Sequence, residues 1–270
     1  MKTVEKVFRY ILLSIAAFII LFPLLYAFFI SLMETGQYIY PSNVLSSLTF
    51  ENYYLALQTA PIFKFLLNSL IFAGLITVGH LITSSLAAFA FVFIPFRGKG
   101  VMFSIVLSTM MIPWEATIIP NYDTIIKLGW LDAFPGLIVP HLALTLGIFL
   151  LRQHFLTLPK ELYEAARIDG CSRFRFFLQM VLPLSRPILA ALGTYSFITN
   201  WNQYLWPLLV TNSNEIRTVQ IGLKMLISQE EQNDFPIIMA GIIMILLPTL
   251  LILVIGHKYL QKGLASYSQK

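Results

Sequence analysis

The chain has 270 residues, of which 57% are hydrophobic and only 11% are charged, and its formal net charge is +5. A soluble domain carries about 25% charged residues, so this composition excludes a water-soluble globule and predicts a protein of the lipid bilayer. The single cysteine excludes an internal disulfide and any cysteine-based metal site.

Stretches that lack Asp, Glu, Lys and Arg predict the membrane spans, because a helix needs about 20 apolar residues to cross a bilayer. Five stretches are long enough: Tyr10–Met33, Phe65–Phe96, Ala133–Leu151, Pro187–Asn214 and Phe235–His257. Val101–Trp114 is shorter, and it counts as a span if it runs on to Ile119 and carries Glu115 near the outer surface. The sequence therefore predicts an all-α, polytopic membrane protein with six transmembrane helices in one domain, residues 1–270.

The positive charges predict the orientation of these spans. With six spans and both termini in the cytoplasm, the outer segments hold Lys64, Lys127, Arg217 and Lys224, and the inner segments hold the other 14 of the 18 Lys and Arg residues. The pI near 9.3 is therefore a sign of topology. It gives no reason to expect nucleic acid as a partner, because the cations are spread over four inner segments.

One inner segment, residues 152–186, is long, amphipathic and strongly basic. Residues Lys160–Asp169 are mostly good helix formers, and Gly170 stops or redirects that helix. Ser172 suits the cap of a second helix, Arg173–Leu182, which is expected to end before Pro183. The sequence thus predicts a short helix, a glycine break and a second helix between two spans.

The first of these short helices has the features of a docking element. Ala165 and Ala166 leave a low apolar ridge, and Glu164 has the spacing to pair with Lys160 or Arg167. A low ridge with charged flanks suits insertion into a groove of another protein. The alternative is a basic loop that only anchors the chain on the inner side of the membrane.

The fifth predicted span ends in a group of polar and aromatic residues. At helical spacing Asn202 and Trp206 share one face, and Asn200 and Gln203 share another. One of these faces is a candidate wall of a translocation path, because amides within a span need partners. The alternative is that the aromatic residues only anchor the helix at the membrane interface.

Two of the four histidines, His80 and His141, are expected at membrane depth, where ionisable groups are functional candidates. We favour the simpler interpretation that each is neutral and hydrogen-bonded between helices. Four scattered histidines and one cysteine form no nucleophile–base pair and no ligand set. We therefore expect no catalytic residue and no metal site.

Several motifs resemble one family. Glu164-Ala165-Ala166, followed by Gly170 and Leu182-Pro183, resembles the "EAA" signature of permease subunits of bacterial ABC importers. The wider run at residues 158–170 resembles the carbohydrate-uptake branch, the relatives of the second maltose permease. The run Trp201–Leu209 is most similar to the second permease of sn-glycerol-3-phosphate importers.

The resemblance implies an importer-type ABC permease fold in the bacterial inner membrane and the transport of a sugar or a sugar-phosphate-like solute, such as sn-glycerol-3-phosphate. It also implies that the inner segment, with Glu164, Ala165, Ala166 and Gly170, is the loop that couples to the ATPase. The implied partners are a second permease subunit in a heterodimer, two ATP-binding subunits, an extracytoplasmic solute-binding protein and membrane lipid. The sequence has no G-x-x-x-x-G-K-[ST] phosphate loop, so ATP and Mg are expected to be used by the partner and no cofactor by this chain.

Two other functions stay open. A permease for a disaccharide or an oligosaccharide would share these motifs. An ion-coupled secondary transporter would need paired intramembrane acids or an inverted repeat, and neither is visible. If the solute is sn-glycerol-3-phosphate, the long charge-free spans offer no cation to its phosphate. The donors are then expected from the binding protein and the other permease, with neutral contacts from this chain.

Overall fold

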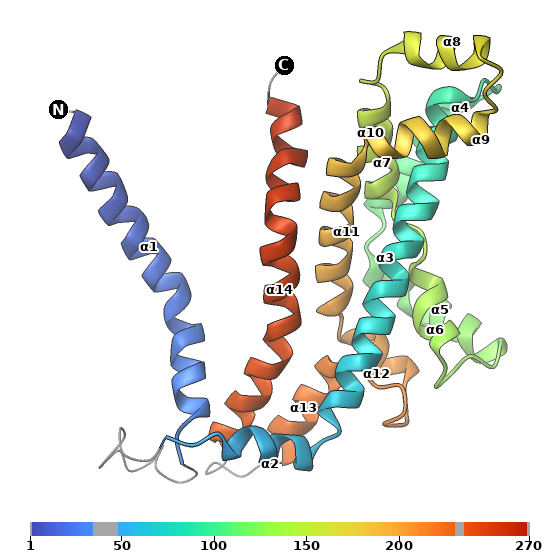
Figure 1. Cartoon of the computed structure of the whole chain (residues 1–270). Helices are drawn as coiled ribbons and strands as arrows, with labels where there is room; N and C mark the ends of the chain where they lie inside the picture. The colour runs from blue at the N-terminus through green and yellow to red at the C-terminus, as the bar shows by residue number, and fades with distance from the viewer. Residues whose placement is uncertain (1, 35–47, 230–234, 269–270) are drawn as a thin grey trace. The chain divides into compact units, whose positions relative to one another are not determined.

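The computed structural model describes residues 2–34, 48–229 and 235–268, and every regular element in these ranges is a helix (Figure 1). The elements are, in chain order, α1 (Lys2–Ser31), α2 (Glu51–Thr59), α3 (Ile62–Phe93), α4 (Lys99–Ser108), η1 (Thr109–Met111), α5 (Trp114–Lys127), α6 (Phe134–Ile138), η2 (Val139–His141), α7 (Thr145–Phe155), α8 (Lys160–Ile168), α9 (Arg173–Phe176), the π-helical turn η3 (Phe177–Val181), α10 (Leu182–Leu184), α11 (Arg186–Trp201), α12 (Leu205–Val210), α13 (Val219–Gln229) and α14 (Phe235–Ser268).

Three of these helices are long and apolar enough to cross a membrane: Glu5–Ser31, Ile62–Phe93 and Phe235–Ile252. Three further spans are possible as pairs of helices that bend sharply at a short break. The bends measure 97° between Lys99–Met111 and Trp114–Lys127, 44° between Phe134–His141 and Thr145–Phe155, and 78° between Arg173–Leu184 and Arg186–Trp201. The predicted all-α fold with up to six spans is confirmed.

The third predicted span breaks at a proline. Ile112 has an extended backbone, with φ −90° and ψ 113°, because the ring of Pro113 disfavours helical geometry at the residue before it. Helix α5 then starts at Trp114 and turns away by 97°. The third span therefore continues past Trp114 to Ile119 only as a bent pair of helices and not as one straight helix.

The fifth predicted span, Pro187–Asn214, is also interrupted. Helix α11 ends at Trp201, and α12 begins only at Leu205. Pro207 explains the gap, because a proline ring displaces the carbonyl four residues earlier, which belongs to Gln203. Asn202 and Trp206 therefore lie on different elements, and their predicted common helical face does not exist.

The chain forms two compact units: Met1–Leu66 with Val219–Pro248, and Leu67–Thr218 with Thr249–Lys270. A single permease domain of residues 1–270 stays a prediction. In the first unit, buried Asn52 on α2 donates its side-chain amide to the carbonyls of Ser31 at 2.8 Å and Met33 at 2.6 Å. These bonds satisfy carbonyls at the end of α1 that have no partner within the helix.

The second unit has two apolar clusters. One joins α3, α7, α8, α9, the π-helical turn η3 and α11, and it comprises Ala88, Phe89, Leu151, Phe155, Ala166, Phe176, Phe177, Val181, Ile188 and Leu192. The other joins α3, α5, α6 and α12 and comprises Phe72, Ile76, Ile125, Leu137, Ile138, Trp206 and Val210. Burial of this apolar surface fixes the segments that surround the candidate site.

Candidate functional site

A histidine on α3 connects three segments of the second unit. The Nε2–H of His80 donates to the backbone carbonyl of His141 in η2, and its Nδ1 lies 2.7 Å from the hydroxyl of Ser196 on α11. Because a carbonyl only accepts, Nε2 carries the proton, and Nδ1 of the neutral ring accepts from Ser196. The prediction of a histidine hydrogen-bonded between helices is confirmed for His80, but it does not hold for Nε2 of His141, which has no hydrogen-bond partner within the described residues.

Asn200 extends this network along α11. Its amide donates to the Ser196 carbonyl at 2.7 Å and lies 3.5 Å from the Ser196 hydroxyl, which is itself 3.2 Å from the hydroxyl of Thr77 on α3. Ser196 and Asn200 are buried. Buried polar groups require such partners, so the network cross-links α3 and α11 through side chains that could not be left unpaired.

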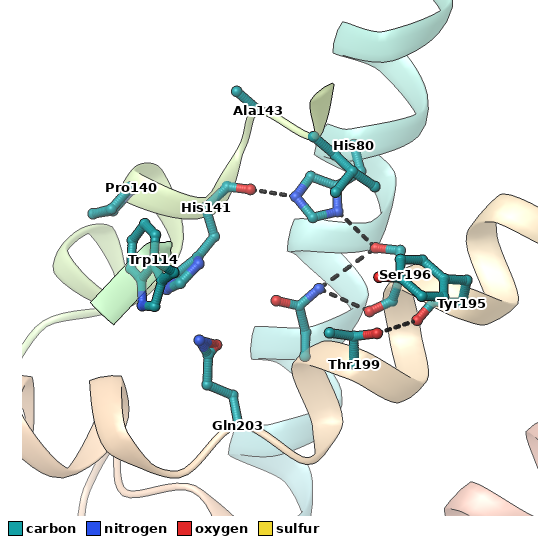
Figure 2. Close-up of a pocket in the computed structure, with 11 residues that line it drawn as sticks. His80, Trp114, Pro140, His141, Ala143, Tyr195, Ser196, Thr199 and Gln203 are labelled. Carbon is teal, nitrogen blue, oxygen red and sulfur yellow. Dashed lines mark hydrogen bonds between the residues drawn. The ribbon is translucent and has the colours of Figure 1, made fainter. Parts of the chain in front are cut away.

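A cavity of about 240 Å³ lies beside this network (Figure 2). Its wall is made of His80, Trp114, Pro140, His141, Ala143, Leu144, Tyr195, Ser196, Thr199, Asn200 and Gln203. None of these residues is Lys, Arg, Asp or Glu. A wall of aromatic and apolar surface with a few amide, hydroxyl and imidazole groups is typical of a binding site for a small molecule, and here it offers no full charge.

Three aromatic rings form one side of the cavity and the packing behind it. The ring centroid of Trp114 lies 4.3 Å from that of His141. The ring centroid of Trp206 lies 5.8 Å from that of Trp114 and 5.9 Å from that of His141. Trp206 is fully buried, and its indole N–H donates to the carbonyl of Gly136 at 3.2 Å. By contrast, Trp114 Nε1 and His141 Nε2 are shut off from solvent and have no hydrogen-bond partner within the described part of the chain.

A second cavity, of about 570 Å³, adjoins the first. Both are lined by Trp114, Ala143, Leu144 and Tyr195. The rest of its wall comes mainly from the break between α4 and α5 and from the start of α7, where the hydroxyls of Thr109 and Thr145 lie 2.9 Å apart. Trp114 therefore belongs to the boundary between the two cavities of this unit.

The four residues predicted for the translocation path fall into two groups. Asn200 and Gln203 line the first cavity, and they come together because the N–H of Gln203 folds back onto the carbonyl of Asn200 at 3.1 Å. Asn202 is exposed, and its amide donates to the carbonyl of Ile198 at 2.9 Å. Trp206 lies in the apolar cluster behind the cavity. Whether any of the four contacts a solute stays a prediction.

Sequence reasoning missed Trp114 as a residue of the cavity wall. A tryptophan at the end of an apolar stretch is usually an interface anchor, and the predicted third span placed it there. The signal was the Pro113 that precedes it, because a proline inside a short span marks a break at which side chains change direction.

The predicted helix–glycine–helix pattern in the inner segment is present. Gly170 has φ +70°, the N–H of Gly170 bonds to the carbonyl of Arg167, and the N–H of Cys171 bonds to that of Ala166. This pair of bonds is the Schellman motif that ends helices at a left-handed glycine. The Ser172 hydroxyl then accepts the N–H of Arg175 at 3.3 Å, as expected of a cap.

Two details of this segment differ from the prediction. The second helix does not end before Pro183: it passes through the π-helical turn η3 and continues to Leu184, since the wide π turn tolerates a proline that an α-helical turn would not. The two alanines also do not form one ridge. Ala165 is exposed, whereas Ala166 is buried in the cluster around Phe176 and Phe177.

The buried side of α8 fixes the position of the helix on the second unit. Tyr163 packs with its ring centroid 5.5 Å from that of Phe93 and 5.1 Å from that of Phe176. Glu164 and Gly170 are exposed, together with Ala165 and Ile168. Helix α8 is thus held by one face while its other face is free to meet a partner.

A family model described as "binding-protein-dependent transport system inner membrane component" matches residues 3–265. The chain belongs to this family. It is a transmembrane permease subunit of a binding-protein-dependent ABC importer, a multi-pass membrane component. The histidine network, the cavity and α8 are therefore features of a permease.

Known proteins agree with this assignment. The permease is 36% identical to the sn-glycerol-3-phosphate transport system permease protein UgpE of Brucella abortus. The alignment is 273 positions long and covers 97% of each chain. It is 41% identical to the protein of that name from Pectobacterium atrosepticum, over 77% of this chain and 74% of the relative. A crystal structure of a bacterial ABC transporter involved in the import of the acidic polysaccharide alginate contains a chain with TM-score 0.85 and 23% identity, covering 95% of this chain and 96% of that one. This last likeness shows the fold alone.

Proposed function

We propose that this permease forms half of the translocation path for sn-glycerol-3-phosphate. The observation that carries the proposal is the 36% identity over nearly the whole chain with a permease protein of a glycerol-3-phosphate transport system. The cavity on the second unit supports it, because its amide, hydroxyl and aromatic lining suits a small polar solute. Asn200 and Gln203 contact the solute in this proposal, whereas Asn202 and Trp206 act only in the structure around it.

The partners in this proposal are a second permease subunit, two ATP-binding subunits and an extracytoplasmic solute-binding protein. The ATP-binding subunits use ATP and Mg, since this chain has no phosphate-binding loop. The permease lies in the bacterial cytoplasmic membrane with both termini in the cytoplasm. The excess of Lys and Arg in the segments assigned to the inside supports this orientation.

Helix α8 is the contact with the ATP-binding subunit in this proposal. Its exposed face carries Glu164, Ala165 and Ile168, and Ile168 is 87% exposed. An apolar side chain so fully exposed on a short helix is the kind of anchor that a groove on a partner buries. The Schellman motif at Gly170 keeps α8 and the segment after it at a fixed angle, so the helix moves as one piece with the second unit.

Reconstitution tests the proposal. The full importer, with both permeases, the ATP-binding subunits and the binding protein from the same genome, is placed in liposomes and supplied with ATP. Uptake of sn-glycerol-3-phosphate, dependent on the binding protein and on ATP, is the expected result. Uptake of maltose or longer oligosaccharides without uptake of sn-glycerol-3-phosphate contradicts the proposed solute and favours the disaccharide alternative.

A further inference from the structure

Three polar side chains without a partner meet at the aromatic side of the 240 Å³ cavity. Trp114 Nε1 and His141 Nε2 have no hydrogen bond, and neither does the carboxamide of Gln203 within the described residues. Figure 2 shows the Gln203 side chain pointing toward the rings of His141 and Trp114. Because buried polar groups almost always have partners, the two closed nitrogen atoms beside the half-exposed carboxamide of Gln203 indicate that a partner is missing from the protein itself.

The chemistry of the three groups indicates what this partner is. The indole N–H only donates, the imidazole nitrogen donates or accepts, and the carboxamide does both. A hydroxyl group, which donates one hydrogen bond and accepts two, complements such a set. A phosphate does not, because the wall has no Lys or Arg and an anion in a charge-free, partly buried site would lose its hydration without compensation.

We propose that this cavity binds the uncharged, hydroxyl-bearing part of the transported solute, with Trp114 and Gln203 as residues that determine specificity for its hydroxyl groups. The inference rests on the proposed function, since a polyol phosphate has such an uncharged part. The phosphate stays outside this cavity and meets other subunits. The hydroxyls bond to Gln203, Trp114 and His141, and the carbon chain lies against the two rings.

The solute reaches Trp114 and His141 only when their rings separate. Both nitrogen atoms are closed to solvent in the structure described, whereas Gln203 is half-exposed in the cavity. A solute that bonds to the two nitrogens interacts more strongly with the separated rings than with the closed pair, and it therefore shifts the equilibrium toward the open arrangement. Since Trp114 also lines the second cavity, its movement connects the two spaces.

Two pairs of matched variants test the inference. Trp114→Phe and Trp206→Phe each remove one indole N–H, but that of Trp206 is already bonded to Gly136. Gln203→Leu and Asn202→Leu each remove one amide, but that of Asn202 is already bonded to Ile198 and is not part of the cavity wall. Each pair therefore separates loss of a solute contact from loss of a side chain of the same kind.

The measurement uses the full importer in liposomes with one binding protein throughout. Uptake of sn-glycerol-3-phosphate is compared with the uptake of two analogues. One is 3-hydroxypropyl phosphate, which lacks the middle hydroxyl, and the other is 2-hydroxypropyl phosphate, which lacks the terminal one. For Trp114→Phe and Gln203→Leu, we expect the preference for sn-glycerol-3-phosphate over at least one analogue to fall about tenfold, the effect of one lost hydrogen bond. Trp206→Phe and Asn202→Leu should keep the parent's preference, although Trp206→Phe should lower the thermal stability.

An unchanged preference in both Trp114→Phe and Gln203→Leu overturns the inference, and so does an equal loss of preference in the two controls. The purified amount and the melting temperature of each variant show whether a lower uptake rate is caused by poorer folding. The ratio of the uptake rates of two solutes does not depend on how much of the variant is folded. Failure of the proposed function looks different. In that case the parent importer itself transports none of the three phosphates, before any variant is compared.

Discussion

Gly136 shows how little room the packing around Trp206 leaves. A Cβ atom there would overlap the carbonyl oxygen of Trp130 and lie 3.1 Å from Cγ2 of Ile125, while the Gly136 carbonyl accepts the indole N–H. A backbone oxygen cannot move aside as a side chain can, so Gly136→Ala is expected to destabilise the protein by about 1–3 kcal/mol. Gly74→Ala is the control, because nothing lies within 4 Å of its Cβ position and alanine favours a helix by up to about 1 kcal/mol. Equal melting temperatures for both variants in detergent would contradict this prediction.

Asp132 controls a turn outside the membrane spans, and its effect depends on pH. Its Oδ1 accepts the N–H of Ser213 at 2.9 Å and that of Asn212 at 2.8 Å. These bonds, first that from Ser213, together with the positive charge of Arg217, hold the pKa of Asp132 below its ordinary value. A lowered pKa in the folded state means that the stabilisation is complete above the unfolded pKa of about 3.9 and is lost as the pH falls through the folded pKa.

Asp132→Asn therefore tests this turn. The difference in melting temperature between parent and variant is expected to be largest near neutral pH and to shrink below about pH 4, because the carboxyl becomes protonated first in the unfolded state and then, at its lowered pKa, in the folded state. The comparison with the variant removes the contribution of the other acids. A difference that stays constant between pH 7 and pH 3 would show that the charge of Asp132 has no role.

Adjacent alanines on α8 have opposite expected effects. Ala166 is buried against Phe176 and Phe177, so Ala166→Trp overpacks that cluster and should lower the stability of the permease by about 1–3 kcal/mol. Ala165 is exposed, so Ala165→Trp should leave the melting temperature unchanged. In the assembled importer, however, it should reduce solute-stimulated ATP hydrolysis about tenfold or more, as expected for a change at the centre of a docking surface. Full ATP hydrolysis by Ala165→Trp would place the partner on another surface.

Gly170 matters for its backbone conformation and less for its size. Its φ is +70°, and nothing lies within 4 Å of the position of a Cβ. Any ordinary side chain therefore has the same left-handed strain of about 1–2 kcal/mol, and asparagine has less. Gly170→Ala and Gly170→Trp should weaken the coupling of ATP hydrolysis to transport to a similar extent, whereas Gly170→Asn should retain it. Transport per ATP hydrolysed is the measurement, and a normal ratio for Gly170→Trp would remove Gly170 from the coupling mechanism.

The number of helical spans could be predicted because apolar length and charge are local properties of the chain. The breaks could not be placed, since they depend on single prolines, such as Pro113 and Pro207, whose effect on a helix varies with its surroundings. The unpredicted breaks also explain why only part of the cavity wall could be predicted from the sequence. Asn200 and Gln203 stand out as polar residues in an apolar stretch, but Trp114 becomes part of the wall only because α5 turns at the break. The faces of α8 were mistaken because the burial of Ala166 depends on Phe176 and Phe177, which lie beyond the glycine turn.

At the scale of the whole molecule, the orientation in the membrane is the property that every proposed contact requires. Fourteen of the 18 Lys and Arg residues lie in segments assigned to the cytoplasm, and such an excess normally remains on the inner side. Two exposed positions in opposite connections report the orientation: Arg97, between the second and third spans, and Asn212, after α12. Single cysteines are placed there in a Cys171→Ser background, which removes the one native thiol.

A membrane-impermeant maleimide applied to intact spheroplasts should label Asn212→Cys and should spare Arg97→Cys until the membrane is permeabilised. Because an even number of spans separates Arg97 from the amino terminus, a protected Arg97→Cys places that terminus in the cytoplasm as well. Labelling of Arg97→Cys before permeabilisation would reverse the topology. It would also put α8, which is assigned to the same side, out of reach of any ATP-binding subunit.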